Sequence, residues 1–218
     1  MKNKLLNKTK QKFNCELERQ YEARFRKFGA TPQGSYWINE TRQNLRFKIL
    51  LDEAKKMQKP GIFSLGDIGC GYGALAQYIV KNQHNKFINY YGYDISQELI
   101  GHCGDNQSHQ GVEFRVGSKP HIKLDFCLMS GTYNLSATHQ VDEWENYVFH
   151  SLNDCWLKTK TAMIFNLQVC KKAHISSGNI FYGNKASILN QCKVSFGPTF
   201  SVDHPDLPHD TTFVVQRN

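Results

Sequence analysis

The sequence predicts an α/β fold built on a mostly parallel sheet of seven strands, with helices on both faces. Three observations support this class. Short apolar segments alternate with helical patterns between residues 62 and 191, which is typical of parallel sheets. A glycine-rich turn follows the first of these segments. The chain ends in two strand-like segments with no helix between them, so the last strand must join the sheet antiparallel.

The expected elements follow in order along the chain. A helix over 11–28 carries apolar or aromatic residues every four positions, and a second helix covers 39–57. The remaining helices are expected at 74–82, from 96, at 142–158 and at 185–191. Strands are expected at 62–69, 89–95, 112–117, 124–131, 161–168, 193–200 and 211–217. We therefore divide the chain into a basic helical extension over 1–38, expected to act as a lid, and one domain over 39–218.

The positive charge is concentrated at the N-terminus. The net charge is +8, and residues 1–27 contain nine Lys or Arg residues and three Glu residues. A basic arm can bind nucleic acid or an anionic surface. A solvated, partly frayed helix is the simpler alternative, and we favour it.

The cysteines and the apolar segments limit the class of protein. The seven cysteines are scattered and form no CxxC pair, so we expect reduced thiols and neither a disulfide framework nor a metal site. No apolar stretch approaches the length of a membrane span, and the N-terminus has no signal-peptide pattern. We therefore expect a cytoplasmic protein with no membrane partner.

The segment SLGDIGCGYGALAQYIV, residues 64–80, predicts a ligand site. Gly69, Gly71 and Gly73 follow a buried strand and open a helix, where missing side chains allow a tight turn and close approach of a ligand. Asp94 ends the second strand, where a carboxylate can accept both hydroxyl hydrogens of a ribose. The pattern indicates a nucleoside-containing ligand. Because Gly69, Gly71 and Ala74 also satisfy a relaxed dinucleotide fingerprint, a nicotinamide oxidoreductase is an alternative.

Two motifs resemble a known family. Asp67 with the three glycines is similar to the first motif of the class I S-adenosylmethionine-dependent methyltransferases, and YGYDIS, residues 91–96, is similar to the second. The reversed last strand matches the Rossmann-like core of that family. The resemblance extends over about residues 40–217 and implies S-adenosylmethionine as the cofactor.

The resemblance also implies roles for single residues. Glycines of the first motif would line the methionine and ribose parts of the cofactor, Asp94 would bind the ribose hydroxyls, and Arg46 could pair with the cofactor carboxylate. Ile95 and the pair Gly117 and Ser118 would lie near the adenine, although the acid that the family often has there is absent. The full set of expected cofactor-binding residues is Arg46, Asp67, Gly69, Cys70, Gly71, Gly73, Asp94, Ile95, Gly117, Ser118, Ser130 and Gly131.

The segment SGTYN, residues 130–134, bears on the methyl acceptor. It resembles uncharacterised bacterial and small-molecule members of the family, and it lacks the tetrapeptide of enzymes that methylate nucleic-acid amino groups. We expect methyl transfer to the nitrogen or oxygen of a small molecule. The alternatives are an RNA methyltransferase that docks through the basic arm, and a protein that binds S-adenosylmethionine without turnover.

Catalytic candidates follow the same segment. A hydroxyl or ammonium acceptor must lose a proton, so a base near the acceptor helps. We select His139 as the base because it follows SGTYN closely, with Tyr133 and Asn134 orienting the acceptor. Tyr36 and Trp37 precede the domain; they could enclose the acceptor or a cation from the lid, or equally pack the N-terminal helix against the core.

Overall fold

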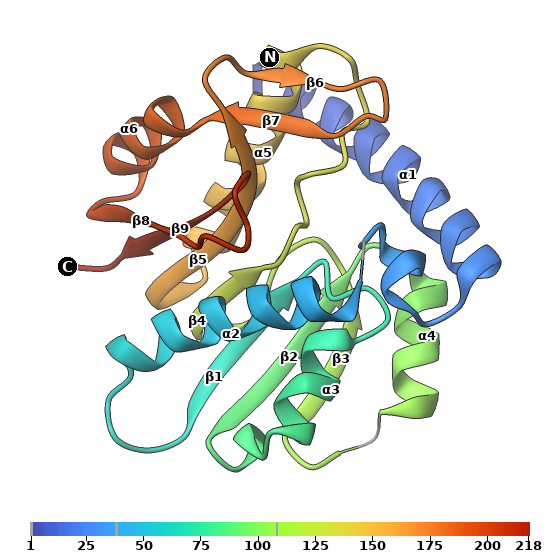
Figure 1. Cartoon of the computed structure of the whole chain (residues 1–218), viewed down its shortest axis with the longest axis vertical. Coiled ribbons are helices and arrows are strands. Elements are labelled where there is room, and N and C mark those ends of the chain that lie inside the picture. The colour runs from blue at the N-terminus through green and yellow to red at the C-terminus, as the bar shows by residue number, and fades with distance from the viewer. Residues whose placement is uncertain (1, 38, 108) are drawn as a thin grey trace.

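The computed structural model describes residues 2–37, 39–107 and 109–218, with the side chains of residues 2–7 left out. A nine-stranded sheet forms the centre of the molecule (Figure 1). Its strands are β1 (Phe63–Ile68), β2 (Ile88–Asp94), β3 (Val112–Val116), β4 (Leu124–Met129), β5 (Thr159–Cys170), β6 (His174–Ile175), β7 (Phe181–Asn184), β8 (Thr199–Asp203) and β9 (Asp210–Gln216).

The strand order confirms the predicted fold class. Strands β3, β2, β1, β4 and β5 lie side by side and are parallel, as expected when helices connect them. Strand β9 pairs antiparallel with β5, and β8 pairs antiparallel with the other edge of β9. The carboxyl ends of β1, β2 and β4 therefore meet at one edge of the sheet, which is where ligands bind in open α/β folds.

In the described ranges, six α-helices surround the sheet. They are α1 (Lys2–Phe28), α2 (Glu40–Met57), α3 (Ala74–Lys81), α4 (Gln97–Asn106), α5 (Val141–Trp156) and α6 (Lys185–Ser195), with 3-10 turns at Pro32–Ser35 and His84–Lys86. Side-chain caps fix where three of these helices begin, because Asn39, Ser96 and Asn184 each accept a backbone N–H from the first turn.

The core lies in two layers, one on each face of the sheet. Phe47, Leu50 and Leu75 of α2 and α3 pack on one face, and Trp144 and Leu152 of α5 pack on the other. The side chains of β5 alternate between these layers, as the geometry of a strand requires. This arrangement explains why the central strands are apolar on both faces.

Helix α1 extends across both helical layers. Its N-terminal half packs on α5, where the Phe13 ring lies 6.0 Å from the Trp144 ring, centroid to centroid. Its C-terminal half reaches α4, where the Phe25 ring lies 5.2 Å from His102. In Figure 1, α1 runs along one side of the molecule from α5 to α4. The helix is therefore an integral part of the fold.

Two expectations for the elements were wrong. Residues 193–195 complete α6, and the next strand begins only at Thr199, because Gly197 and Pro198 separate the two elements. The segment after β5, expected to be a loop, contains the short hairpin of β6 and β7, which pairs with the end of β5. This hairpin accounts for nine strands where seven were expected. Among the helices of the described residues, none is long and apolar enough to cross a membrane.

Candidate active site

A cavity lies at the carboxyl ends of β1, β2 and β4. Leu17 and Tyr21 of α1 line it on one side, together with Ser35, Tyr36 and Trp37 of the following segment. The glycine turn after β1, the ends of β2, β3 and β4, helices α2 and α5, and the β6–β7 hairpin also contribute to its lining. The predicted ligand site and the predicted N-terminal lid segment therefore meet at one place.

The three glycines of the turn serve different purposes. All have positive φ, +76° at Gly69, +57° at Gly71 and +82° at Gly73, which other residues rarely adopt. A Cβ on Gly73 would lie 2.3 Å from Nε2 of Gln107, so this glycine is needed for packing, and it does not line the cavity. A Cβ on Gly71 would meet only Ser35 Oγ, at 3.3 Å. Gly71 is thus the position where the backbone is open toward the cavity.

Asp94 is held next to this open position. Its Oδ2 accepts the Gly71 N–H at 2.9 Å and its Oδ1 accepts the Ser96 N–H at 2.9 Å. The side chain is buried and lines the cavity, and burial raises its pKa above the usual value although the two N–H groups act in the opposite direction. Each carboxylate oxygen can accept a further hydrogen bond, so Asp94 can receive two hydroxyl groups.

Asp67 lies under the same turn. Its Oδ2 accepts the Tyr90 hydroxyl hydrogen at 2.7 Å, and burial raises its pKa to about 7. The carboxyl group is 2% exposed but lines the cavity. Its charge therefore changes near neutral pH, directly beneath the ligand site.

A closed ring of contacts joins the loop after β4 to α2 and to the lid segment. The Gly131 N–H donates to Asn166 Oδ1 at 2.7 Å, and Asn166 Nδ2 donates to Asp210 Oδ1 at 2.7 Å. Asp210 forms an ion pair with Arg46, and the Arg46 guanidinium lies 4.2 Å from the centre of the Trp37 ring. A Cβ on Gly131 would come within 3.0 Å of that ring. Trp37 therefore closes the cavity over a second position that lacks a side chain.

Arg46 is more constrained than the sequence indicated. It is a cavity-lining residue of α2, and Asp210 already neutralises its charge. Its Nε has no hydrogen-bond partner among the described residues, so one donor remains for a ligand. The Ser130 hydroxyl is likewise buried without a hydrogen-bond partner in this part of the chain, and it also lines the cavity.

Most of the other predicted site residues also line the cavity. Ile95, Gly117 and Ser118 lie in its lining after β2 and β3. Cys70 lines it too, but burial raises the pKa of its thiol well above the usual value, so the sulfur stays protonated. Tyr133 lines the cavity as a buried side chain.

Asn134 and His139 are placed differently. Asn134 lines the cavity, but its Oδ1 accepts the Gln168 N–H at 3.0 Å, which ties the loop after β4 to β5. His139 is exposed and belongs to a separate groove that it shares with Lys12 and Arg19 of α1. It is not among the residues that line the cavity.

Several cavity residues were not found by sequence reasoning. Leu17 and Tyr21 come from α1, Tyr147 and Ser151 from α5, and Ile180 from the β6–β7 hairpin. They belong to no motif. The one available signal was the helical spacing of Leu17 and Tyr21, and of Tyr147 and Ser151, which puts each pair on one helix face.

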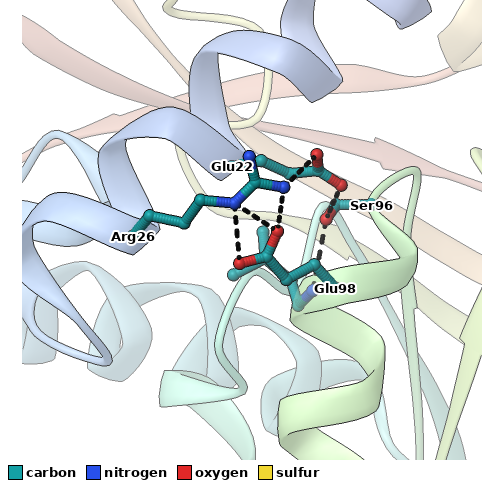
Figure 2. A network of polar contacts seen from close by, with 5 residues as sticks. Glu22, Arg26, Ser96 and Glu98 are labelled. Carbon is teal, nitrogen blue, oxygen red and sulfur yellow. Dashed lines mark hydrogen bonds and ion pairs between the residues drawn. The ribbon is translucent and has the colours of Figure 1, made fainter.

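A polar network fastens α1 beside Asp94. Figure 2 shows Arg26 reaching from α1 to Glu98 at the start of α4, with an N···O distance of 2.5 Å. In the same view the Ser96 hydroxyl donates to Glu22 at 2.9 Å and caps α4 by accepting the Leu99 N–H. Ser96 also donates its backbone N–H to Asp94, so this one residue connects α1 with Asp94, the candidate for binding the ribose.

Comparisons with known proteins agree with this geometry. Residues 66–148 match the family model described as "Methyltransferase domain". The chain is 22% identical over 157 residues to a Mycobacterium tuberculosis protein named "Putative methyltransferase Rv1506c". The aligned region covers 71% of this chain and 93% of that protein.

Two solved structures share the fold. One is a magnesium protoporphyrin IX methyltransferase from Synechocystis, solved with bound S-adenosylmethionine, which aligns with a TM-score of 0.56 at 14% identity. The alignment covers 81% of this chain and 80% of the Synechocystis chain. An S-adenosylmethionine-dependent methyltransferase from Leishmania major aligns with a TM-score of 0.63 at 10% identity, covering 92% and 82%. At such identities these structures are evidence for the fold alone.

The domain match covers residues 66–148, and the two solved structures share the fold. They confirm the resemblance to the class I S-adenosylmethionine-dependent methyltransferases. The part of the chain that matches the family model begins in β1 and ends in α5, so it contains the glycine turn, Asp94 and the loop after β4.

Proposed function

We propose that this protein transfers a methyl group from S-adenosylmethionine to a nitrogen or oxygen atom of a small molecule. The observation that carries the proposal is the Asp94 carboxylate held beside Gly71, at a turn open toward a covered cavity. A nucleoside can lie against such a turn while its ribose hydroxyls donate to the carboxylate.

The residues of the cavity fit S-adenosylmethionine. Asp94 would hold the ribose, Ile95 with Gly117 and Ser118 would flank the adenine, and the turn at Gly71 would support the chain between ribose and sulfur. The unpartnered Ser130 hydroxyl and Arg46 Nε would hold the methionine end. When bound, the cofactor supplies an electrophilic methyl group, and the protein must position the acceptor and exclude water.

Helix α1 supports a small-molecule acceptor over RNA. Lys10 pairs with Asp154 at 2.6 Å, Arg26 pairs with Glu98, and the Arg24 guanidinium lies 4.1 Å from the centre of the Tyr36 ring. These basic side chains therefore contact the protein's own surface. The side chains of Lys2 and Lys4 lie outside the described residues. With α1 fastened over the cavity, we propose that residues 1–38 act as a lid.

Ligand binding by the Asp94 site is the first test. Replacing Asp94 with Asn keeps the size of the side chain and removes the charge that accepts the ribose hydroxyls. We expect S-adenosylhomocysteine to raise the melting temperature of the wild type, and the variant to bind it at least tenfold more weakly by calorimetry. Glu113→Gln is the control, because Glu113 is paired with Arg115 on β3 and does not line the cavity.

The same protein tests the acceptor class. Transfer of an isotope-labelled methyl group should occur with a pool of small metabolites and not with total RNA. Labelled RNA, formed at a rate that falls steeply with salt, would instead favour the RNA methyltransferase. Binding of S-adenosylhomocysteine by Asp94→Asn as tightly as by the wild type would refute the assignment of the site.

A further inference from the structure

Part of the cavity remains after the cofactor residues are assigned. We call this part the acceptor chamber and define it by Tyr21, Tyr133, Leu135, Tyr147, Ser151 and Ile180. The inference drawn from it rests on the proposed function, because the chamber is assigned to the methyl acceptor only if the rest of the cavity holds the methyl donor.

The charges around the cavity disfavour an anionic acceptor. Among its described lining residues the charged side chains are Asp67, Asp94 and Arg46, and Asp210 neutralises Arg46. No lysine or histidine of that lining could pair with a carboxylate or phosphate. An anion would thus leave water for a site whose remaining charges are negative, which is costly.

The chamber also lacks a base. Asp67 and Asp94 line the part of the cavity that is assigned to the cofactor, and neither belongs to the chamber. Burial raises the pKa of Tyr21, Tyr133 and Tyr147, so these hydroxyls stay protonated. An alcohol or phenol would need a proton acceptor before attack, whereas a neutral amine already carries a free electron pair.

The aromatic side chains favour a positive charge. Tyr133 and Tyr147 meet edge to face at 6.4 Å between ring centroids, and Tyr21 meets Tyr36 of the lid segment in the same way at 5.4 Å. Rings arranged around a nitrogen stabilise positive charge through their electron-rich faces. They also supply an apolar surface for the body of the acceptor.

Ser151 is a buried polar group of the chamber. It is 2% exposed and lines the cavity from α5, and its Oγ makes no hydrogen bond of full geometry within the described part of the chain, although it lies close enough to the Tyr147 hydroxyl to lower the pKa of that group. A buried hydroxyl whose hydrogen bonding is incomplete costs free energy, so a ligand that bonds to it gains affinity. Ser151 is therefore suited to position an acceptor that carries a neutral hydrogen-bonding group.

We propose that the acceptor is a small amine without carboxylate or phosphate groups, bound between the tyrosines of the acceptor chamber and positioned by Ser151. The amine loses its ammonium proton to solvent before the reaction, and the electron pair of the neutral nitrogen then forms the bond to the methyl carbon. The carbon–sulfur bond breaks and its electrons remain on sulfur. The positive charge moves from sulfur to nitrogen among the aromatic rings, and the nitrogen then loses a proton to solvent.

Two isosteric probes test the charge preference. Phenethylamine and 3-phenylpropionate have similar shapes and opposite charges. In calorimetry with the protein saturated by S-adenosylhomocysteine, we expect phenethylamine to bind at least tenfold more tightly than 3-phenylpropionate. Equal or tighter binding of 3-phenylpropionate, or binding of neither probe by protein that does bind S-adenosylhomocysteine, would overturn the proposal. Failure to bind S-adenosylhomocysteine would instead refute the proposed function.

A serine substitution tests the positioning role. Ser151→Ala should weaken phenethylamine binding by about three- to tenfold, because one hydrogen bond is lost, while the melting temperature and the affinity for S-adenosylhomocysteine stay unchanged. Ser187→Ala, at an exposed position of α6, is the matched control and should change neither affinity. Unchanged phenethylamine binding by Ser151→Ala would overturn the role of Ser151.

Discussion

Asp67 and Asp94 lie on neighbouring strands, and their surroundings give them different chemistry. Asp94 is bonded to two backbone N–H groups, which favour its charged form against the effect of burial. Asp67 has one hydroxyl donor, and burial raises its pKa to about 7. The first residue is therefore suited to bind hydroxyl groups, and the second changes charge beneath the ligand near neutral pH.

The titration of Asp67 gives a prediction about pH. Because its folded pKa is raised to about 7, the carboxyl is mostly protonated at pH 6 and mostly ionised at pH 8. The ionised form attracts the positive sulfonium of S-adenosylmethionine, but not the neutral sulfur of S-adenosylhomocysteine. We expect calorimetry to show the ratio of their affinities shifting toward S-adenosylmethionine by roughly three- to tenfold from pH 6 to pH 8.

Replacement of the carboxyl is the control for this pH effect. Asp67→Asn can still accept the Tyr90 hydroxyl hydrogen but cannot ionise, so the ratio of affinities should not vary with pH in that variant. Any other ionisation that affects both ligands equally has no effect on the ratio of their affinities. A ratio that rises equally in wild type and variant would show that Asp67 is not the responsible group.

At the scale of elements, the glycine turn and Asp94 could be predicted from sequence motifs. The acceptor chamber could not be predicted in this way. The turn and the acid are adjacent in sequence to the strands they terminate, so local patterns identify them. Tyr21, Tyr147 and Ile180 come from three elements far apart in sequence and meet only through tertiary packing. His139 was selected by its closeness to SGTYN, but the loop directs it to the surface beside α1.

The attachment of α1 is testable through Arg26. This side chain pairs with Glu98 of α4 and with Glu22 of its own helix, so Arg26→Ala removes the ion pair between the two helices and leaves the packing of Phe25 on His102. We expect amide hydrogen exchange in the C-terminal half of α1 to become several-fold faster and binding of S-adenosylhomocysteine to weaken a few-fold. The melting temperature should change little because the pair is exposed.

Arg19 provides the comparison within the same helix. Within the part of the chain that the structure describes, its ion pair is with Glu16, three residues earlier in α1, and this pair contacts no other element. Arg19→Ala should therefore leave the exchange of the C-terminal half of α1 and the ligand affinity as they are in the wild type. Equal effects of the two substitutions would contradict the role of Arg26 as the attachment.

At the scale of the whole molecule, the two helical layers, the sheet edge and α1 together produce one covered cavity. The alternation of strands and helices made the sheet and its reversed strand predictable, since both follow from connection lengths. The packing of α1 was less predictable. Its aromatic residues recur every four positions, but this spacing does not indicate that they contact side chains of α4 and α5.

The most direct test of the account is the position of bound S-adenosylhomocysteine in a crystal structure of the complex. We predict electron density for the nucleoside against the backbone at Gly71, with both ribose hydroxyls within hydrogen-bond distance of Asp94 and the sulfur facing the acceptor chamber. Density at any other place on the molecule, or a ribose that does not contact Asp94, would contradict the central claim.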